Sequence, residues 1–123
     1  DVEETAIRTV RQFGIEATRN PGFPGVWVGN SKIASLGIAV QRHVTLHGLA
    51  MNVDRDLSLF NFITPCGLDG VTATSVQREQ TGPPASMAEV KSRFLEAFCE
   101  VFAQPQPPLQ SAEDCQALLA TQA

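Results

Sequence analysis

Two residues of this chain carry side chains suited to covalent chemistry. Lys32 is the only lysine before residue 91, and arginine fills every other basic position among the first 78 residues. An amine can lose its proton whereas a guanidinium cannot, so a lone lysine suggests that titration is needed. Cys66 lies between Pro65 and Gly67, which favours a thiol exposed at a loop tip. Simpler interpretations are a solvated turn lysine and a buried structural cysteine.

Two predicted strands beside Lys32 lack bulk on one face. Residues 32–41 and 44–53 are predicted to be antiparallel strands, joined at Arg42 and His43. Alternate strand positions share a face, and the small residues do so: Ser35, Gly37 and Ala39 on the first strand, Gly48 and Ala50 on the second. Glycine inside a strand marks the approach of another group, so we predict a groove. The flanking Leu36, Ile38, Leu49 and Met51 could wall it, and a helix packed on the small residues is an equal alternative.

Other elements must position these strands. The spacing of apolar residues predicts a helix over 2–13 and a short strand over 15–18, followed by a turn cluster over 20–25. A hairpin then joins residues 26–28 to the first long strand through Gly29, Asn30 and Ser31. Asp54 or Asp56 is expected to cap a helical turn through Phe60, before a loop over 63–67 and a weak strand over 72–76. Ser86 and Glu89 form a capping box for a further helix, and a last short helix is expected from Ser111.

Composition narrows the class of protein. The 123 residues are 43% hydrophobic and 18% charged, which is typical of one globular domain. The net charge of −4 disfavours nucleic-acid binding, although residues 1–78 carry seven charges of each sign and balance. The longest uncharged apolar stretch covers 33–40, far short of the ~20 residues that cross a bilayer. No leader pattern opens the chain, so nothing suggests secretion.

The remaining polar residues give weak signals. Three cysteines without a C-x-x-C pair disfavour a disulfide framework or zinc site and favour a reducing compartment. His43 and His47 lack a third ligand, and His47 is expected to form a hydrogen bond within the sheet. Asn52 and Asp54 are expected to be turn and cap residues. No glycine-rich phosphate motif is present.

Five short sequence segments of this chain resemble segments of the lipoyl(octanoyl) transferases, in the same order and at similar spacing. The resemblance covers about residues 3–78, through Gly25–Val28, Lys32–Gly37, His47–Ala50, Asn52-Val53 with Asp56-Leu57, and Pro65-Cys66-Gly67 followed by Thr74-Ser75. It implies an α+β fold, a mixed sheet with packed helices, like the catalytic domains of biotin and lipoate protein ligases. It further implies a cytoplasmic enzyme that needs no cofactor or metal.

The resemblance also implies the reaction and its residues. An octanoyl group moves from acyl carrier protein to a lysine of lipoyl domains, in 2-oxoacid dehydrogenases and the glycine cleavage H protein. Cys66 corresponds to the nucleophile that forms a thioester, and Lys32 to its partner. The acyl-contacting segments correspond to two short runs of the predicted groove: Ser35, Leu36 and Gly37 on one strand, and Gly48, Leu49 and Ala50 on the other.

This chemistry is physically coherent. A thiol with a pKa of ~8.5 is only ~3% thiolate at pH 7. A nearby ammonium can lower that pKa to about 6.5, so that most of the thiol is ionised. Lys32, once neutral, could then accept a proton from the attacking amine. Amide formation from a thioester is downhill, so no ATP is required.

The resemblance covers only the C-terminal half of the family's domain. The N-terminal half, which supplies part of the acyl pocket in the family, has no counterpart in this sequence. We therefore expect residues 1–78 to be a portion of the catalytic core, and residues 79–123 to be a helical extension of the same domain. The alternatives are a non-catalytic acyl-binding or carrier-docking module and a relative of ATP-dependent lipoate ligases. Cys66 argues against both.

Overall fold

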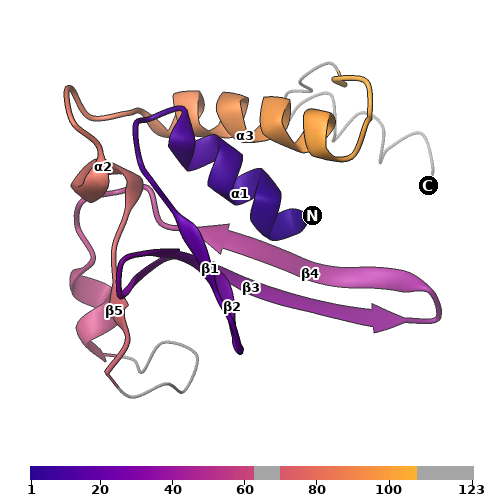
Figure 1. Ribbon diagram of the computed structural model, residues 1–123, viewed down its shortest axis with the longest axis horizontal. Helices are drawn as coiled ribbons and strands as arrows, with labels where there is room; N and C mark the ends of the chain where they lie inside the picture. Colours follow the sequence, from indigo (N-terminus) through magenta and orange to yellow (C-terminus); the bar gives the residue numbers. More distant parts are fainter. Residues whose placement is uncertain (63–69, 108–123) are drawn as a thin grey trace, which may run out of the picture.

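A mixed β-sheet with two helices on one face forms the framework of the computed structural model, which describes residues 1–62 and 70–107 (Figure 1). Four strands follow one another antiparallel across the sheet: β1 (Thr18–Asn20), β2 (Phe23–Val28), β3 (Ser31–Gln41) and β4 (Val44–Met51). The short β5 (Thr72–Ala73) pairs parallel with β3. The predicted α+β class with a mixed sheet is confirmed.

Helix α1 (Val2–Arg11) starts with acidic residues and ends with basic ones, which suits the helix dipole. Helix α3 (Met87–Val101) packs against α1 and has the predicted capping box, in which the backbone N–H of Ser86 donates to Glu89 over 2.8 Å. The core lies between these helices and the sheet. It joins Ile7 and Val10 of α1 to Val26 of β2 and Ala34 of β3.

Three local predictions need correction. The first strand lies at 18–20 rather than 15–18, because Ile15 and Ala17 are buried in the core as the chain leaves α1. The predicted turn cluster contains only a short turn, and β2 already begins at Phe23. The predicted strand over 72–76 ends after two residues, because Ser75 already occupies the N-cap position of the short helix α2 (Val76–Glu79). The expected turn after Asp56 is a short 3-10 helix, η1 (Ser58–Phe62).

The tip of the β3–β4 hairpin projects beyond the ends of α1 and α3 (Figure 1). Every residue from 37 to 47 is exposed, including Val40 at 69% and Val44 at 60% of their surface. Both turn residues, Arg42 and His43, have positive φ, as two-residue hairpin turns require. None of the helices within 1–62 and 70–107 is long and apolar enough to cross a membrane.

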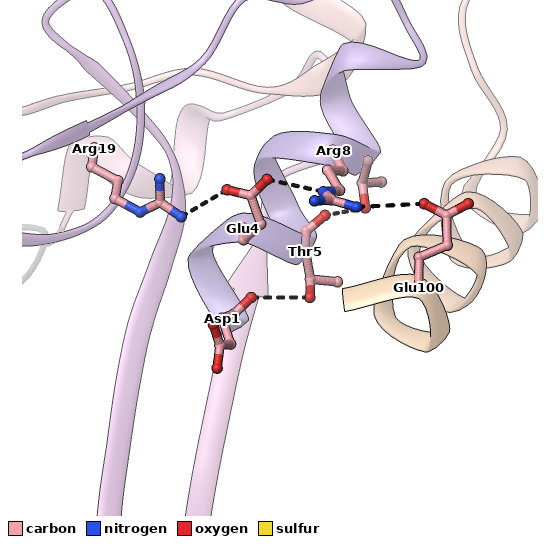
Figure 2. Close-up of polar contacts among 7 residues, drawn as sticks. Asp1, Glu4, Thr5, Arg8, Arg19 and Glu100 are labelled. Carbon is pink, nitrogen blue, oxygen red and sulfur yellow. Dashed lines mark hydrogen bonds and ion pairs between the residues drawn. The ribbon is translucent and has the colours of Figure 1, made fainter. Parts of the chain in front are cut away.

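Ion pairs tie α1 to both the sheet and α3 (Figure 2). Glu4 accepts hydrogen bonds from Arg8 over 2.9 Å and from Arg19 of β1 over 2.8 Å. Arg8 also lies 3.7 Å from Glu100 of α3. The hydrogen bonds from Arg8 and Arg19 lower the pKa of Glu4 from 4.5 to about 2.

Replacing Glu4 should destabilise the fold at neutral pH and not in acid. Because the pKa of Glu4 is about 2 when folded and near 4.5 when unfolded, its contribution is present above about pH 5 and is lost as pH falls toward 2. Urea denaturation should therefore show a lower free energy of unfolding for Glu4→Gln at pH 7, with the difference shrinking by pH 2.5. Glu16→Gln, which alters an exposed carboxylate, is the control. A pH-independent difference for Glu4→Gln would contradict this assignment.

Candidate functional site

One extra residue in β3 decides which way Lys32 faces. Val26 lies opposite Ala34, but the next residue, Trp27, lies opposite Lys32, so Ile33 is an additional residue on β3. Residues directly opposite one another share a face, and successive residues of β2 point to opposite faces. Lys32 and Ala34 therefore lie on opposite faces, and Lys32 shares its face with Ser35. Since Val26 and Ala34 pack in the core beneath α1, Lys32 points away from the helices.

Lys32 is buried on that face beside an aromatic ring. Only 4% of its surface is exposed, and its Nζ lies 4.9 Å from the centre of the Trp27 ring. An ammonium over an indole face is attracted by the ring electrons. The Trp27 ring is held in turn by its Nε1–H, which donates to the carbonyl of Phe23 over 3.3 Å. The interpretation of Lys32 as a solvated turn lysine is therefore wrong.

Gly25 gives the Lys32 side chain room to lie across β2. A Cβ atom added at Gly25 would stand 3.3 Å from Cε of Lys32 and 2.6 Å from the carbonyl oxygen of Ala34. Gly25 also has a φ of +126°, a conformation that side chains rarely allow. Both the backbone angle and the close approach thus require glycine at this position.

Hydrogen bonds from two later segments fix the backbone around Lys32. The backbone N–H of Thr74 donates to the carbonyl of Lys32, and that of Asn52 to the carbonyl of Ile33. The Asn52 side chain donates to the carbonyl of Thr74 over 3.0 Å, so it joins the two segments. The prediction of Asn52 as a turn residue is therefore wrong. Asp54 does act locally, since it accepts from the backbone of Asp56.

Ser75 belongs to one of the blocks that carry the family resemblance, but the sequence predicts no role for it. Its side chain is fully buried, and its hydroxyl has no hydrogen-bond partner within 1–62 and 70–107. An unpaired buried hydroxyl costs free energy, so it needs a reason to be there. Outside the resemblance its type and position give no signal, because serine is common before a helix, although the Ser75 side chain makes no capping hydrogen bond.

Four of the five small residues predicted to form a groove floor lie opposite one another, whereas Ala39 lies opposite Leu46. Ser35 pairs with Ala50, and Gly37 pairs with Gly48, so all four share the face that also carries Lys32. A Cβ atom at Gly37 or Gly48 would have open space within 4 Å. No helix of the described residues packs on this strip, so that alternative is wrong for this part of the chain.

The prediction that the flanking apolar side chains form the walls of this groove is wrong. Leu36 pairs with Leu49, and this pair lies on the opposite face from Gly37 and Gly48. Leu49 and Met51 pack toward the core instead, and a cleft of about 310 Å³ separates them from Met87, Val90 and Phe94 of α3. Leu36 and Leu49 therefore cannot flank the small residues with hydrocarbon. An acyl contact through their backbone stays a prediction.

Of the other residues and elements predicted from the sequence, some lie within the described residues and some lie outside them. Cys66 lies outside the described residues, as does the helix expected from Ser111. His47 is exposed with a φ of 68°, and no hydrogen bond of its side chain is found within the described chain, contrary to expectation. Cys99 of α3 is a half-buried free thiol, 3.8 Å from the carbonyl of Pro105. Within residues 1–62 and 70–107, no three His, Cys, Asp or Glu side chains are grouped to hold a metal.

Comparison with protein families adds a match over most of the chain. Residues 1–99 match the family model of the lipoyl protein ligase A/B catalytic domain. The octanoyltransferase of Desulfovibrio desulfuricans is 56% identical over 97% of this chain, which corresponds to 53% of that protein. The octanoyltransferase of Nitratidesulfovibrio vulgaris is 51% identical over 85% of this chain and 48% of its own length. The chain thus spans about half the length of these curated relatives.

The fold also resembles a solved structure. A putative lipoate protein ligase from T. acidophilum with bound lipoic acid superposes with a TM-score of 0.67 at 19% identity. The superposition covers 94% of this chain and 48% of the other. At this low identity the likeness concerns the fold alone.

Substituting Gly25 should be costly because two effects add. Gly25→Ala places a methyl group against the Ala34 carbonyl in a backbone conformation that favours glycine, and should lower the free energy of unfolding by about 3 kcal/mol. Gly14→Ala is the matched control, because Gly14 also has a positive φ but open space around it, and should cost only about 1 kcal/mol. Urea denaturation measures both. Equal losses would show that the close contact at Gly25 contributes nothing.

Proposed function

The chain belongs to the lipoyl protein ligase A/B catalytic domain family, and we propose that it carries the nucleophile and the lysine of an octanoyl-transfer site. The donor is octanoyl-acyl carrier protein, and the acceptor is a lysine of a lipoyl domain. Curated octanoyltransferases at 56% and 51% identity support the octanoyl group as the one transferred. We place the reaction in the cytoplasm, as the family resemblance implies.

The observation that carries the proposal is the placement of Lys32. A buried amine lies on the same sheet face as an open strip of small residues, Ser35, Gly37, Gly48 and Ala50. An extended acyl chain needs a flat apolar floor, and these residues leave space for one. A buried ammonium at the end of that floor can attract a thiolate, which is the reactive form of cysteine.

In the proposed first step, the Cys66 thiolate attacks the carbonyl carbon of the carrier thioester. A new carbon–sulfur bond forms, the bond to the carrier sulfur breaks, and the carrier leaves as a thiol with a proton from the Lys32 ammonium, which becomes neutral. One thioester replaces another, so this step is nearly isoenergetic. Lys32 stabilises the thiolate through its positive charge.

In the proposed second step, the acceptor lysine attacks the Cys66 thioester as a neutral amine. The amide bond forms, Cys66 leaves as a thiolate, and a proton of the attacking amine passes to Lys32 in its neutral form. Lys32 thus serves as a charge in one step and as a base in the other.

The chain's length relative to its relatives bears on whether it acts alone. It spans 53% of the Desulfovibrio desulfuricans protein, and its β3–β4 hairpin exposes Val40 and Val44. We propose that the remaining half of the family domain covers this hairpin and is needed for turnover. The packing of α3 against α1, together with a family match that reaches residue 99, supports residues 79–123 as an extension of the same domain.

The proposed mechanism predicts a covalent octanoyl adduct on Cys66. Intact mass spectrometry after mixing with octanoyl-acyl carrier protein should show an adduct that maps to Cys66 and is removed by hydroxylamine. The mixture is tested with and without a polypeptide that carries the uncovered half of the Desulfovibrio desulfuricans relative. Cys66→Ser should abolish the adduct, whereas Cys99→Ser, the control thiol, should retain it. If neither mixture gives an adduct, a non-catalytic acyl-binding or carrier-docking module becomes the better account.

Filling the groove should select against long acyl chains. Gly37→Leu adds a branched side chain to the open floor, so adduct formation with octanoyl carrier should fall about tenfold or more while butyryl transfer changes less. Thr45→Leu is the matched control, because Thr45 is an exposed hairpin residue on the opposite sheet face. If both variants lose octanoyl transfer equally, the floor is not the acyl site.

A further inference from the structure

A side chain of α1 makes direct contact with the strand that supports Lys32. The backbone N–H of Gly25 in β2 donates a hydrogen bond to Oε1 of Glu3 over 3.0 Å. Glu3 belongs to the first turn of α1, twenty-two residues earlier in the chain, and its side chain is only 23% exposed. A hydrogen bond to an ionised and partly buried acceptor is stronger than one between neutral groups.

The same glycine forms the surface on which the Lys32 side chain lies. The Cβ position of Gly25 is 3.3 Å from Cε and 3.5 Å from Cδ of Lys32. A shift of the Gly25 backbone toward or away from β3 must therefore move the amine or open space beneath it. The contact from Glu3 fixes the Gly25 backbone at this point.

Both oxygens of the Glu3 carboxylate are engaged. Oε2 lies 3.3 Å from Nε of Arg19 in β1, while Oε1 accepts from Gly25. Arg19 is itself held by Glu4 (Figure 2). The carboxylate of Glu3 thus connects β1, β2 and α1 on the side of the sheet away from the Lys32 amine.

We propose that Glu3 is a positioning residue for Lys32: its carboxylate holds the Gly25 backbone, and Gly25 in turn holds the lysine side chain in place. Glu3 does not touch the amine. That this positioning serves acyl transfer rests on the proposed function, whereas the positioning itself does not.

Amine labelling tests the proposal without any need for transfer activity. The chain contains only two lysines, Lys32 and Lys91. Lys91 is exposed on α3 and serves as an internal reference. The full chain is treated with a limiting amount of acetic anhydride, and peptide mass spectrometry gives the ratio of acetylation rates at the two lysines. Because Lys32 is 4% exposed, its labelling reports local opening of the strand around it.

Glu3→Ala should raise the Lys32-to-Lys91 ratio about fivefold, the change that corresponds to ~1 kcal/mol for one lost hydrogen bond. Glu3→Gln keeps an oxygen that can accept from Gly25 and should stay near the wild-type ratio. Glu4→Ala is the matched control, because it breaks neighbouring ion pairs of the same helical turn without touching Gly25. It should also leave the ratio unchanged.

Two results would overturn the proposal: an unchanged ratio in Glu3→Ala, or an equal rise in Glu3→Ala and Glu4→Ala. If Glu3→Ala does not fold by circular dichroism, Glu3→Asp takes its place. Asp at this position keeps the charge but shortens the reach to Gly25 by one methylene, so the ratio should still rise while Glu4→Ala stays unchanged. A raised ratio combined with normal octanoyl transfer by Cys66→Ser would support the positioning and refute the proposed function.

Discussion

The extra residue at Ile33 is the constraint on which the candidate site depends. Strict alternation along β3 would place Lys32 and Ser35 on opposite faces of the sheet, because they are three residues apart. The bulge changes the register between β2 and β3, so that Ile33 and Ala34 both reach the core while Lys32 and Ser35 share the other face. Bulges that reorient one side chain recur beside functional sites, and this one joins an amine to an open apolar floor.

Three separate segments keep the bulged strand in place. Asn52 and Thr74 bind the carbonyls of β3 from one side, and β2 pairs with it on the other. Helix α1 contributes from a distance, through Glu3 and Gly25. A buried lysine demands such support, because a charge removed from water is tolerated only where its surroundings are fixed and complementary. A strand held in place therefore keeps the Lys32 amine at a fixed position relative to the groups that surround it.

The sequence alone predicts much of this fold, because the relevant signals are local. Gly29 and Asn30 specify the hairpin turn, Ser86 and Glu89 specify the start of α3, and the small residues of β3 and β4 do form one strip. The family resemblance predicted from five short blocks agrees with the family that residues 1–99 match.

The errors arise where the outcome depends on contacts between distant segments. A bulge leaves no mark in the composition of β3, so the side on which Lys32 lies could not be deduced from alternation. Leu36 and Leu49 were expected to flank the small residues because they are neighbours in sequence, yet strand geometry sends neighbours to opposite faces. Asn52 has the composition of a turn residue, and only the folded chain brings Thr74 within reach of its amide.

The outer edge of β4 also affects how the chain can associate with other molecules. Proteins protect exposed strand edges with lysine, proline, inward charge or bulges, and β4 contains no Lys, Arg, Asp, Glu or Pro. Within the described residues no strand pairs with that edge, and the apolar Val44 and Leu46 lie along it. Such an edge can add a strand from any neighbouring molecule. Strand addition at this edge would make association of the chain depend on its concentration, through the same hairpin that carries the strip of small residues.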